Sequence, residues 1–346
     1  MPWKFQQIEP AVARGTLREE LWDDPEWVAE EKYDGDRRIA QFCGSVVRFT
    51  GRRKSVKDGL FVEKTENVPH LSGSDKVTGP GVSVLHLPPR SLDGTVLDGE
   101  MVFTGFPNKE MDQGGHSKFV TSIMGSLPEE AITKQIERGW LRYVVFDCLF
   151  FKGEDVRGRD TFQRWSLALR AVKEWANPFV SVSEQYGEKG EDKRKVYEKI
   201  AARGGEGIIL KHLVAKYGDR QAWVKVKREW TADVVITGFQ TAKKESRKKS
   251  GVVSATKYAE AGLIGAVVCG QWKCNEQSGW TEVATVSGMD DDLRGDITNH
   301  PKKYLGKVLR IKHNGKEPTG RFRHPRWDGL RSDKSPKDCI FDLEEK

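Results

Sequence analysis

The stretch EEKYDGDR, residues 30–37, joins a nucleophilic side chain to a tight turn. The run from Val28 to Lys32 is strand-like, and Gly35 allows the chain to turn sharply after it. A lysine at such a strand end can project into a cleft, and Arg37 returns a second cation toward it. Lysine attacks only as the neutral amine, a form that nearby cations and burial favour. Lys32 is therefore a candidate nucleophile, although the same stretch also fits a solvated charged turn.

Short strand-like runs recur over the first 230 residues and are rich in β-branched and aromatic side chains. They cover residues 28–32, 38–42, 45–49, 96–103, 143–151, 207–211 and 222–226. Helical spacing marks Asp160–Trp175 and Asp192–Arg203, and the irregular segment 104–137 predicts a helix after Pro128. These elements predict an α+β domain with antiparallel sheets over residues 1–230.

The remaining residues, 231–346, predict a second domain that is a small all-β barrel. Strand-like runs over 234–239, 263–272, 280–286 and 307–312 alternate with turns, which is typical of such barrels. A polar loop between the first two runs carries five cations, which are Lys243, Lys244, Arg247, Lys248 and Lys249. Lys and Arg side chains bind phosphate without reading bases, so this loop is a candidate contact for nucleic acid.

The composition favours a polyanionic partner and a reducing compartment. Lys and Arg number 58 against 51 Asp and Glu, which gives a formal charge of +7 and an isoelectric point near 9.0. The 5 cysteines are scattered without the spacing of a zinc site, so we expect reduced thiols in a cytoplasmic protein. No apolar run approaches the roughly 20 residues of a membrane span, and the N-terminus has no signal-peptide pattern. We therefore expect neither secretion nor a membrane partner.

Further motifs place acids and cations on strands. Asp98 and Glu100 alternate onto one face of the run 96–103, and Lys225 and Lys227 share a face of the run 223–227. The candidate residues on these and the neighbouring runs are Glu100, Phe146, Glu206, Ile208, Lys225 and Lys227. Each motif alone fits a core position or a solvated strand. Taken together with a lysine on a turn, they describe a site for a nucleotide phosphate and its metal.

In this order, the motifs resemble the set that marks the covalent nucleotidyltransferase superfamily of DNA ligases, RNA ligases and mRNA capping enzymes. The resemblance runs from about residue 28 to 335 and ends on Arg331-Ser332-Asp333-Lys334. It implies a nucleotidyltransferase (adenylation) domain followed by an OB-fold barrel. Glu206 before the run 207–211, and His324-Pro325-Arg326-Trp327 near the end, resemble the corresponding elements of ATP-dependent DNA ligases. The chain as a whole is similar to the minimal two-domain core of such enzymes.

Three other functions remain as alternatives. An RNA ligase and a capping guanylyltransferase belong to the same superfamily and share the nucleotide pocket. The third is a non-catalytic OB-type binder of nucleic acid, which the basic charge and 11 tryptophans would also fit. That binder gives no reason for Lys32, Glu100 and Glu206, so we expect an enzyme.

The resemblance implies an adenylate on Lys32 that is formed from ATP and passed to the 5′-phosphate of a nick in duplex DNA. Lys225 and Lys227 would hold the α-phosphate during this transfer. Arg331 and Lys334 would close over the triphosphate and then leave, which implies a domain swing. The resemblance suggests a monomer that acts in the cytoplasm of a bacterial or phage-infected cell.

The resemblance also implies which side chains bind the metal and the nucleoside. Glu100 and Glu206 would bind the ribose hydroxyl of the nucleotide or, together with Asp34, Mg²⁺ or Mn²⁺, cations that prefer oxygen ligands. Phe146 would stack on adenine, with Ile208 as the opposite wall and Glu30 reading the amino group. Arg37 and Arg52 would contact the ribose or the 5′-phosphate of the nick, where Arg53 is the alternative in the register of the second arginine.

The cationic loop 243–249 gives a prediction about salt dependence. Replacing its lysines by glutamine should weaken binding to nicked DNA. The slope of log affinity against log salt, which is negative, should shrink in magnitude by about one for each lost phosphate contact. The slope is measured by titrating labelled nicked duplex at several salt concentrations, with lysine-to-arginine replacements as the charge-conserving control. An unchanged slope would mean that the loop is only solvated.

Overall fold

The computed structural model describes residues 3–73, 87–103, 113–187, 192–228, 230–242, 246–247, 253–254, 257–273, 279–317 and 319–341. The chain divides into two compact units, residues 1–228 and residues 229–346. The first unit is α+β with antiparallel sheets, and the second is a barrel of strands, in agreement with the predicted fold class. None of the helices in the described ranges has both the length and the apolar character that crossing a membrane requires.

The larger sheet of the first unit has seven strands in the order β4-β3-β2-β5-β6-β7, with β8 parallel to β6. The strands are β2 (Asp36–Cys43), β3 (Val46–Lys54), β4 (Phe61–Glu63), β5 (Val96–Val102), β6 (Arg142–Phe151), β7 (Glu154–Asp155) and β8 (Val180–Val182). Central strands β2 and β5 are apolar on both faces over part of their length, which agrees with a sheet covered on both sides.

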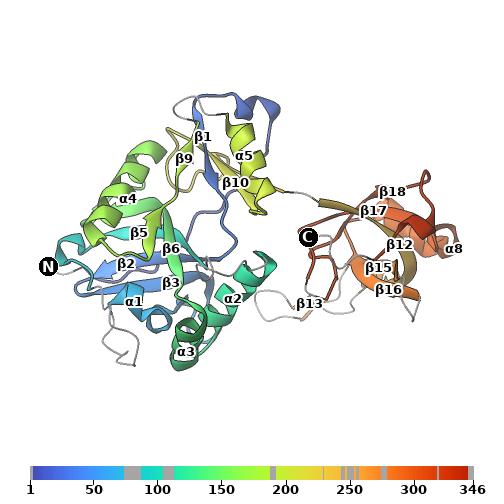
Figure 1. The fold of residues 1–346 in the computed structure, drawn as a ribbon, viewed down its shortest axis with the longest axis horizontal. Helices are drawn as coiled ribbons and strands as arrows, with labels where there is room; N and C mark the ends of the chain where they lie inside the picture. The colour runs from blue at the N-terminus through green and yellow to red at the C-terminus, as the bar shows by residue number, and fades with distance from the viewer. Residues whose placement is uncertain are drawn as a thin grey trace. The chain divides into compact units, whose positions relative to one another are not determined.

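The helices α1 (Pro69–Ser72), α2 (Gln113–Gly125), α3 (Pro128–Arg138) and α4 (Thr161–Trp175) share one core with this sheet (Figure 1). Phe42 of β2 meets Trp175 of α4 edge to face at 4.8 Å between ring centroids. Helix α3 begins at Pro128, as predicted, because proline suits the first helical turn. Arg37, Asp98 and Glu100 therefore lie on the other face of the sheet, away from this core.

The smaller sheet has four strands in the order β11-β10-β1-β9. Its strands are β1 (Trp27–Glu31), β9 (Gln185–Tyr186), β10 (Gly207–His212) and β11 (Trp223–Lys227). Helix α5 (Lys193–Ala202) lies against β1 and β10 (Figure 1), and its Ile200 joins Ile208 and Leu210 in an apolar cluster. Asp192 caps this helix by accepting hydrogen bonds from the N–H groups of Arg194 and Lys195.

A buried lysine connects the two sheets. The ammonium group of Lys211 on β10 bonds to Glu30 of β1 at 2.8 Å and donates to the carbonyl of Phe146 on β6 at 3.0 Å. The side chains of Lys211 and Glu30 are each 2% exposed. Removing one partner of such a pair leaves a buried charge without its counter-charge, which typically costs about 3–5 kcal/mol. Lys211 thus fixes the spacing of the sheets beside the candidate site.

The N-terminal segment 3–15, here called the strap, touches both sheets. Gln6 and Gln41 of β2 exchange two hydrogen bonds of 3.1 and 2.7 Å, and Ile8 is buried against the larger sheet. At its other end, Gly15 donates to the carbonyl of Trp223 on β11 at 3.0 Å. A Cβ atom on Gly15 would lie 2.4 Å from the carbonyl oxygen of Gln221, so only glycine allows this approach. The strap therefore holds the sheets together from outside.

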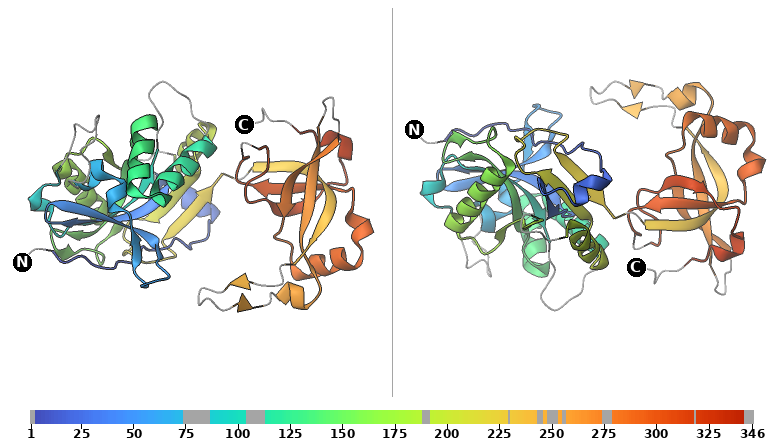
Figure 2. Two further views of the ribbon diagram at one scale, coloured as in Figure 1. Left: turned by 90° about the horizontal axis from the view of Figure 1, so that it is seen from below. Right: turned by 90° about the horizontal axis from the view of Figure 1, so that it is seen from above.

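The second unit is a five-stranded barrel in the order β16-β15-β12-β17-β18, and its curved strands run from yellow to red in Figure 2. The strands are β12 (Trp230–Thr241), β15 (Ile264–Lys273), β16 (Gly279–Val286), β17 (Val308–His313) and β18 (Arg326–Leu330). A parallel bridge between Ser287 and Arg326 joins the two end strands. This order, with α7 (Asp291–Asn299) and α8 (Pro301–Tyr304) before β17, is that of an OB fold.

The cationic loop of this unit is described only in part. Arg247 lies in β13 (Ser246–Arg247), which pairs with β14 (Val253–Ser254), and the short helix α6 (Lys257–Glu260) follows. Lys243, Lys244, Lys248 and Lys249 lie outside the described residues. The contact of this loop with DNA stays a prediction.

Candidate active site

Lys32 lies where the chain leaves the smaller sheet and enters the larger one. It follows β1 directly and donates its backbone N–H to the carbonyl of Gly207 at 2.9 Å. The turn after it passes close to β5, because a Cβ atom on Gly35 would lie 1.9 Å from the carbonyl oxygen of Met101. Only glycine therefore allows the approach, so the structure requires Gly35 for space beside β5, whereas the sequence suggested it for a sharp turn. The side chain of Lys32 is 19% exposed, which leaves its amine reachable.

One carboxylate holds both Lys32 and Lys227. Glu206 forms an ion pair with the amine of Lys32 through one oxygen and with Lys227 at 2.8 Å through the other. Burial raises the pKa of Glu206, but the two lysines outweigh burial, and its pKa lies below the ordinary value. An ionised Glu206 thus orients the candidate nucleophile and its neighbouring cation.

The cations beside Glu206 crowd each other. The pKa of Lys225 is lowered by burial first, and then by the charges of Lys32, Lys227, Arg52 and Arg37. The charge of Arg52 also lowers the pKa of Glu100. Of the two alternatives on β3, Arg52 and Arg53, it is therefore Arg52 that belongs to this group. Cations lower the pKa of a neighbouring amine because they repel its protonated form. An anion placed among them would relieve that repulsion. The cluster is therefore suited to a phosphate.

Glu100 completes the group from β5. Burial raises its pKa to about 8, although the charges of Lys32, Arg37 and Arg52 act in the opposite direction. A carboxyl group that keeps its proton near neutral pH lies where the protein only partly compensates the negative charge of its ionised form. It would ionise more readily if a metal ion or another cation came close.

The third predicted metal ligand, Asp34, contacts helix α2. Its carboxylate is exposed and accepts a hydrogen bond of 3.1 Å from the hydroxyl of Ser117 on α2. Within the described residues, no three His, Cys, Asp or Glu side chains gather as a metal site. Mg²⁺ commonly takes only one or two carboxylates, and substrate phosphates and water complete its shell. Glu100 and Glu206, both close to Lys32, fit that mode of binding.

The aromatic candidate Phe146 is half-buried beside the small sheet. Its ring lies 6.3 Å from that of Trp223, edge to face, and the guanidinium of Arg37 lies 5.2 Å from its centre. Lys211 lies 5.0 Å from the same ring. Phe146 thus lies beside two cations of the first unit, and its stacking on a nucleobase stays a prediction.

The prediction for Ile208 is wrong, because its side chain points to the opposite face. Ile208 is fully buried in the cluster that α5 covers, whereas Ile209 pairs with Glu30 and Lys225 and lies on the face of the site. Strand alternation fails between Glu206 and Ile208 because Gly207 has a φ of 138°, where a side chain would be strained. Ile209 takes the position that was assigned to Ile208.

The role predicted for Glu30 is also corrected. Its two carboxylate oxygens are occupied, one by Lys211 and the other by the side-chain amide of Gln185 at 2.8 Å. The side chain is 2% exposed, so it does not face a ligand. Glu30 supports the site by holding Lys211.

Arg37 is bound more tightly than the sequence indicated. Its guanidinium makes a two-bond ion pair with Asp98, and the distance from Nε to the carboxylate is 2.9 Å. Asp98 is fully buried, and it also accepts a hydrogen bond of 2.6 Å from Tyr217. In the sequence, Asp98 stands out only as a neighbour of Glu100 on the same strand face. No local pattern marks Asp98 or Tyr217 as a partner of Arg37.

The C-terminal cations belong to the second unit and are paired there. Lys334 forms an ion pair with Asp233 of β12 at 2.6 Å, and Arg331 lies 3.3 Å from the same carboxylate. Arg331 also bonds twice to Asp333, at 2.8 and 2.7 Å. Sequence reasoning missed Asp233, which neutralises both cations from a distant strand.

The chain is similar to known ligases in both sequence and fold. The family described as "ATP dependent DNA ligase domain" matches residues 16–227. DNA ligase 4 of Candida albicans is 27% identical over 241 residues, which cover 66% of this chain and 25% of that protein. The protein "Multifunctional non-homologous end joining protein LigD" of Pseudomonas aeruginosa is 27% identical over 236 residues, which cover 66% of this chain and 23% of that protein.

Two further comparisons extend over more of the chain. DNA ligase 4 of Coprinopsis cinerea is 24% identical over 354 residues, covering 91% of this chain and 32% of that protein. This chain thus spans about a third or less of these curated relatives. A solved structure from a study of Lig E DNA ligases shares the fold, with a TM-score of 0.61 and 16% identity over 94% of this chain and all of that one.

The raised pKa of Glu100 predicts how stability depends on pH. Between the ordinary value of 4.5 and about 8, the unfolded chain has released this proton while the folded chain keeps it. The wild type therefore loses stability as pH rises through this window. Glu100→Gln avoids this loss, so its advantage in free energy of unfolding should grow by at least about 1 kcal/mol from pH 5 to pH 8.

The measurement is chemical denaturation at several pH values, without nucleotide and with a chelator. Glu130→Gln is the matched control, because Lys134 lowers the pKa of the exposed Glu130 below its ordinary value. Its effect should stay constant from pH 5 to 8. The same constancy in Glu100→Gln would contradict a raised pKa.

Proposed function

Because this chain belongs to the family of ATP-dependent DNA ligases, we propose that it seals 3′-hydroxyl/5′-phosphate nicks in duplex DNA through a covalent adenylate on Lys32. The observation that carries the proposal is the surroundings of Lys32. Its amine is held by Glu206, beside Lys227 and Lys225, where the two sheets meet. A nucleophile, a carboxylate that orients it and cations for the phosphate are thereby combined in one place.

The first step forms a bond between Nζ of Lys32 and the α-phosphorus of ATP. The bond from that phosphorus to the bridging oxygen breaks, pyrophosphate leaves, and the amine gives up its proton. Lys225 and Lys227 lie on one exposed face of β11 and offset charge on the phosphate oxygens. Because phosphoryl transfer needs positioning and charge neutralisation above all, these side chains supply what it requires.

The next two steps move the AMP and join the strands. An oxygen of the 5′-phosphate at the nick attacks the phosphorus of the lysyl adenylate, and the bond to Lys32 breaks. The 3′-hydroxyl then attacks the activated 5′-phosphate, releases AMP and loses its proton. Arg37 and Arg52, which both act on Glu100 and Lys225, are suited to contact the ribose or the 5′-phosphate.

Glu100 and Glu206 are the proposed ligands of Mg²⁺ or Mn²⁺, with Asp34 closer to the 3′ side of the nick. The metal would neutralise charge on the phosphates when bound. Glu206 already serves two lysines, so it orients Lys32 in the protein alone. Phe146 is proposed to stack on adenine, and Ile209 to form the opposite wall in place of Ile208.

The proposed partner is nicked duplex DNA, bound by a monomer, with the loop 243–249 among its contacts. The family match and the relatives named DNA ligases favour DNA over an RNA ligase or a capping guanylyltransferase. The matched catalytic domain also argues against a non-catalytic OB-type binder. We propose a cytoplasmic enzyme, and the fungal relatives widen the expected source beyond a bacterial or phage-infected cell.

The lysine nucleophile is tested by labelling. Wild-type protein mixed with Mg²⁺ and ATP labelled in the α-phosphate should retain the label after denaturation, and its intact mass should rise by one AMP. Lys32→Ala should lose the label. Lys32→Arg should lose it as well, because arginine keeps the cation beside Glu206 but stays protonated and cannot act as a nucleophile. Label that persists in either variant would place the adenylate elsewhere.

The C-terminal cations are tested by separating the steps. Arg331→Ala and Lys334→Ala should reduce self-adenylation at least about tenfold more than sealing of a pre-adenylated nick, because only the first step involves the triphosphate. Lys337→Ala removes an exposed cation from the same tail and should affect neither step by more than about twofold. Equal losses in both steps would contradict a lid that acts on ATP alone.

A further inference from the structure

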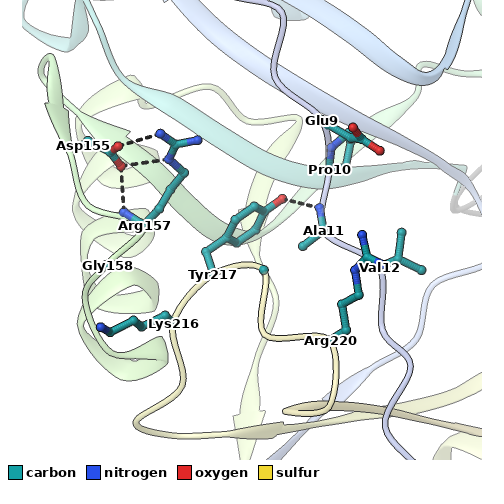
Figure 3. A pocket seen from close by; sticks show the side chains of 11 residues that line it. Glu9, Pro10, Ala11, Val12, Asp155, Arg157, Gly158, Lys216, Tyr217 and Arg220 are labelled. Atoms are coloured by element: carbon teal, nitrogen blue, oxygen red, sulfur yellow. Dashed lines mark hydrogen bonds and ion pairs between the residues drawn. The ribbon is translucent and has the colours of Figure 1, made fainter.

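Tyr217 lies in the loop between β10 and β11 and joins the strap to the larger sheet. Its hydroxyl donates to Oδ2 of Asp98 at 2.6 Å and accepts the backbone N–H of Ala11 at 3.0 Å. Figure 3 shows the second of these bonds, with the ring of Tyr217 pointing toward Ala11. The ring also packs edge to face on Trp223, at 5.9 Å between centroids. Packing and two hydrogen bonds thus fix the hydroxyl.

These contacts close a ring of hydrogen bonds around Arg37. Asp98 accepts from Nε and Nη2 of Arg37, and Nη1 of Arg37 donates to the carbonyl of Ala11 at 2.6 Å. The same strap residue therefore binds Tyr217 through its N–H and Arg37 through its carbonyl. The four members come from four separate segments: the strap, β2, β5 and the loop before β11. No single element positions Arg37 by itself.

The ring of hydrogen bonds leaves two N–H donors of the Arg37 guanidinium unused among the described residues, and these can meet a ligand. Arg37 has five N–H donors, and three of them are used within the part of the chain that the structure describes. Asp98 is fully buried, so its oxygens bond where water does not compete. The pKa of Tyr217 lies well above its ordinary value because of burial and the charge of Asp98, and its hydroxyl keeps the proton that it donates.

We infer that Tyr217 is a positioning residue for Arg37: through Asp98 and Ala11 it holds the guanidinium so that the two remaining donors meet the ribose or phosphate of the nucleotide. This role rests on the proposed function, which supplies the nucleotide. Arg37 touches the ligand and Tyr217 acts only through it. The strap takes part directly, because Ala11 contributes both backbone groups to the ring.

The ring of Tyr217 lines a groove, and a substitution that keeps this ring tests the hydroxyl alone. The groove has a volume of about 500 Å³, and Pro10, Arg157 and Arg220 line it together with the tyrosine (Figure 3). Tyr217→Phe keeps the ring, its packing on Trp223 and the shape of the groove. It removes one hydroxyl, and with it the bonds to Asp98 and Ala11.

A first measurement does not depend on catalysis. The Nε–H signal of Arg37 in a nitrogen–proton NMR spectrum is assigned by its disappearance in Arg37→Ala. Its exchange with water should be at least about tenfold faster in Tyr217→Phe than in the wild type, because the guanidinium is less restrained. An unchanged exchange rate would overturn the positioning role, whatever the protein catalyses.

A second measurement is a double-mutant cycle on self-adenylation. Tyr217→Phe should lower kcat/KM for ATP about tenfold, mainly by raising KM, since it disturbs binding more than the chemical step. In the Arg37→Ala background the same change should have less than about a twofold effect. Two additive losses would show that Tyr217 does not act through Arg37 and would overturn the inference.

Tyr143→Phe is the matched control for the loss of a buried hydroxyl. Tyr143 is fully buried on β6, and its hydroxyl donates to the carbonyl of Arg38 at 2.8 Å without touching the guanidinium of Arg37. This variant should lower the melting temperature at least as much as Tyr217→Phe while leaving kcat/KM within about twofold. A wild type that fails to label itself would refute the proposed function, and the NMR exchange rate would still decide the role of Tyr217.

Discussion

The arrangement of the candidate site depends on one buried ammonium group, that of Lys211. It bonds to Glu30 in the smaller sheet and to the carbonyl of Phe146 in the larger sheet, so it sets how far apart the two sheets lie. A buried cation must keep its counter-charge, and this requirement prevents the sheets from sliding. Glu30 belongs to β1, and Lys32, the proposed nucleophile, follows that strand directly. Its position is therefore a consequence of the same pair.

A second constraint is the excess of positive charge around Glu206. Lys32, Lys225 and Lys227 lie close together, and the carboxylate of Glu206 is shared between two of them. Three cations surround one ionised carboxylate, so the group remains short of negative charge. The site is thus organised before a ligand arrives, which reduces the reorganisation that catalysis would otherwise require.

Much of the fold and many candidate residues could be predicted from the sequence, because strands such as β5 and β11 show alternation within a few residues. The errors have local causes. Gly207 interrupts the alternation, so Ile208 was placed on the wrong face. Helix α2 contains two adjacent glycines, and burial of Phe119 and Ile123 stabilises it rather than a strong helix signal. The partners of Glu30 and Asp98 lie 181 and 119 residues away, at Lys211 and Tyr217, where no local pattern connects them.

The pairing of Asp233 with Arg331 and Lys334 has an energetic consequence for how the tail would take up a polyphosphate. These two cations never need to stand alone, because an incoming anion replaces a carboxylate that already neutralises them. The uptake is a counter-ion exchange, in which the desolvation penalty of an unpaired charge is avoided at both ends. Its driving force would be only the difference between two anions, which would keep the affinity modest and suit a group that is proposed to bind a nucleotide and then release it.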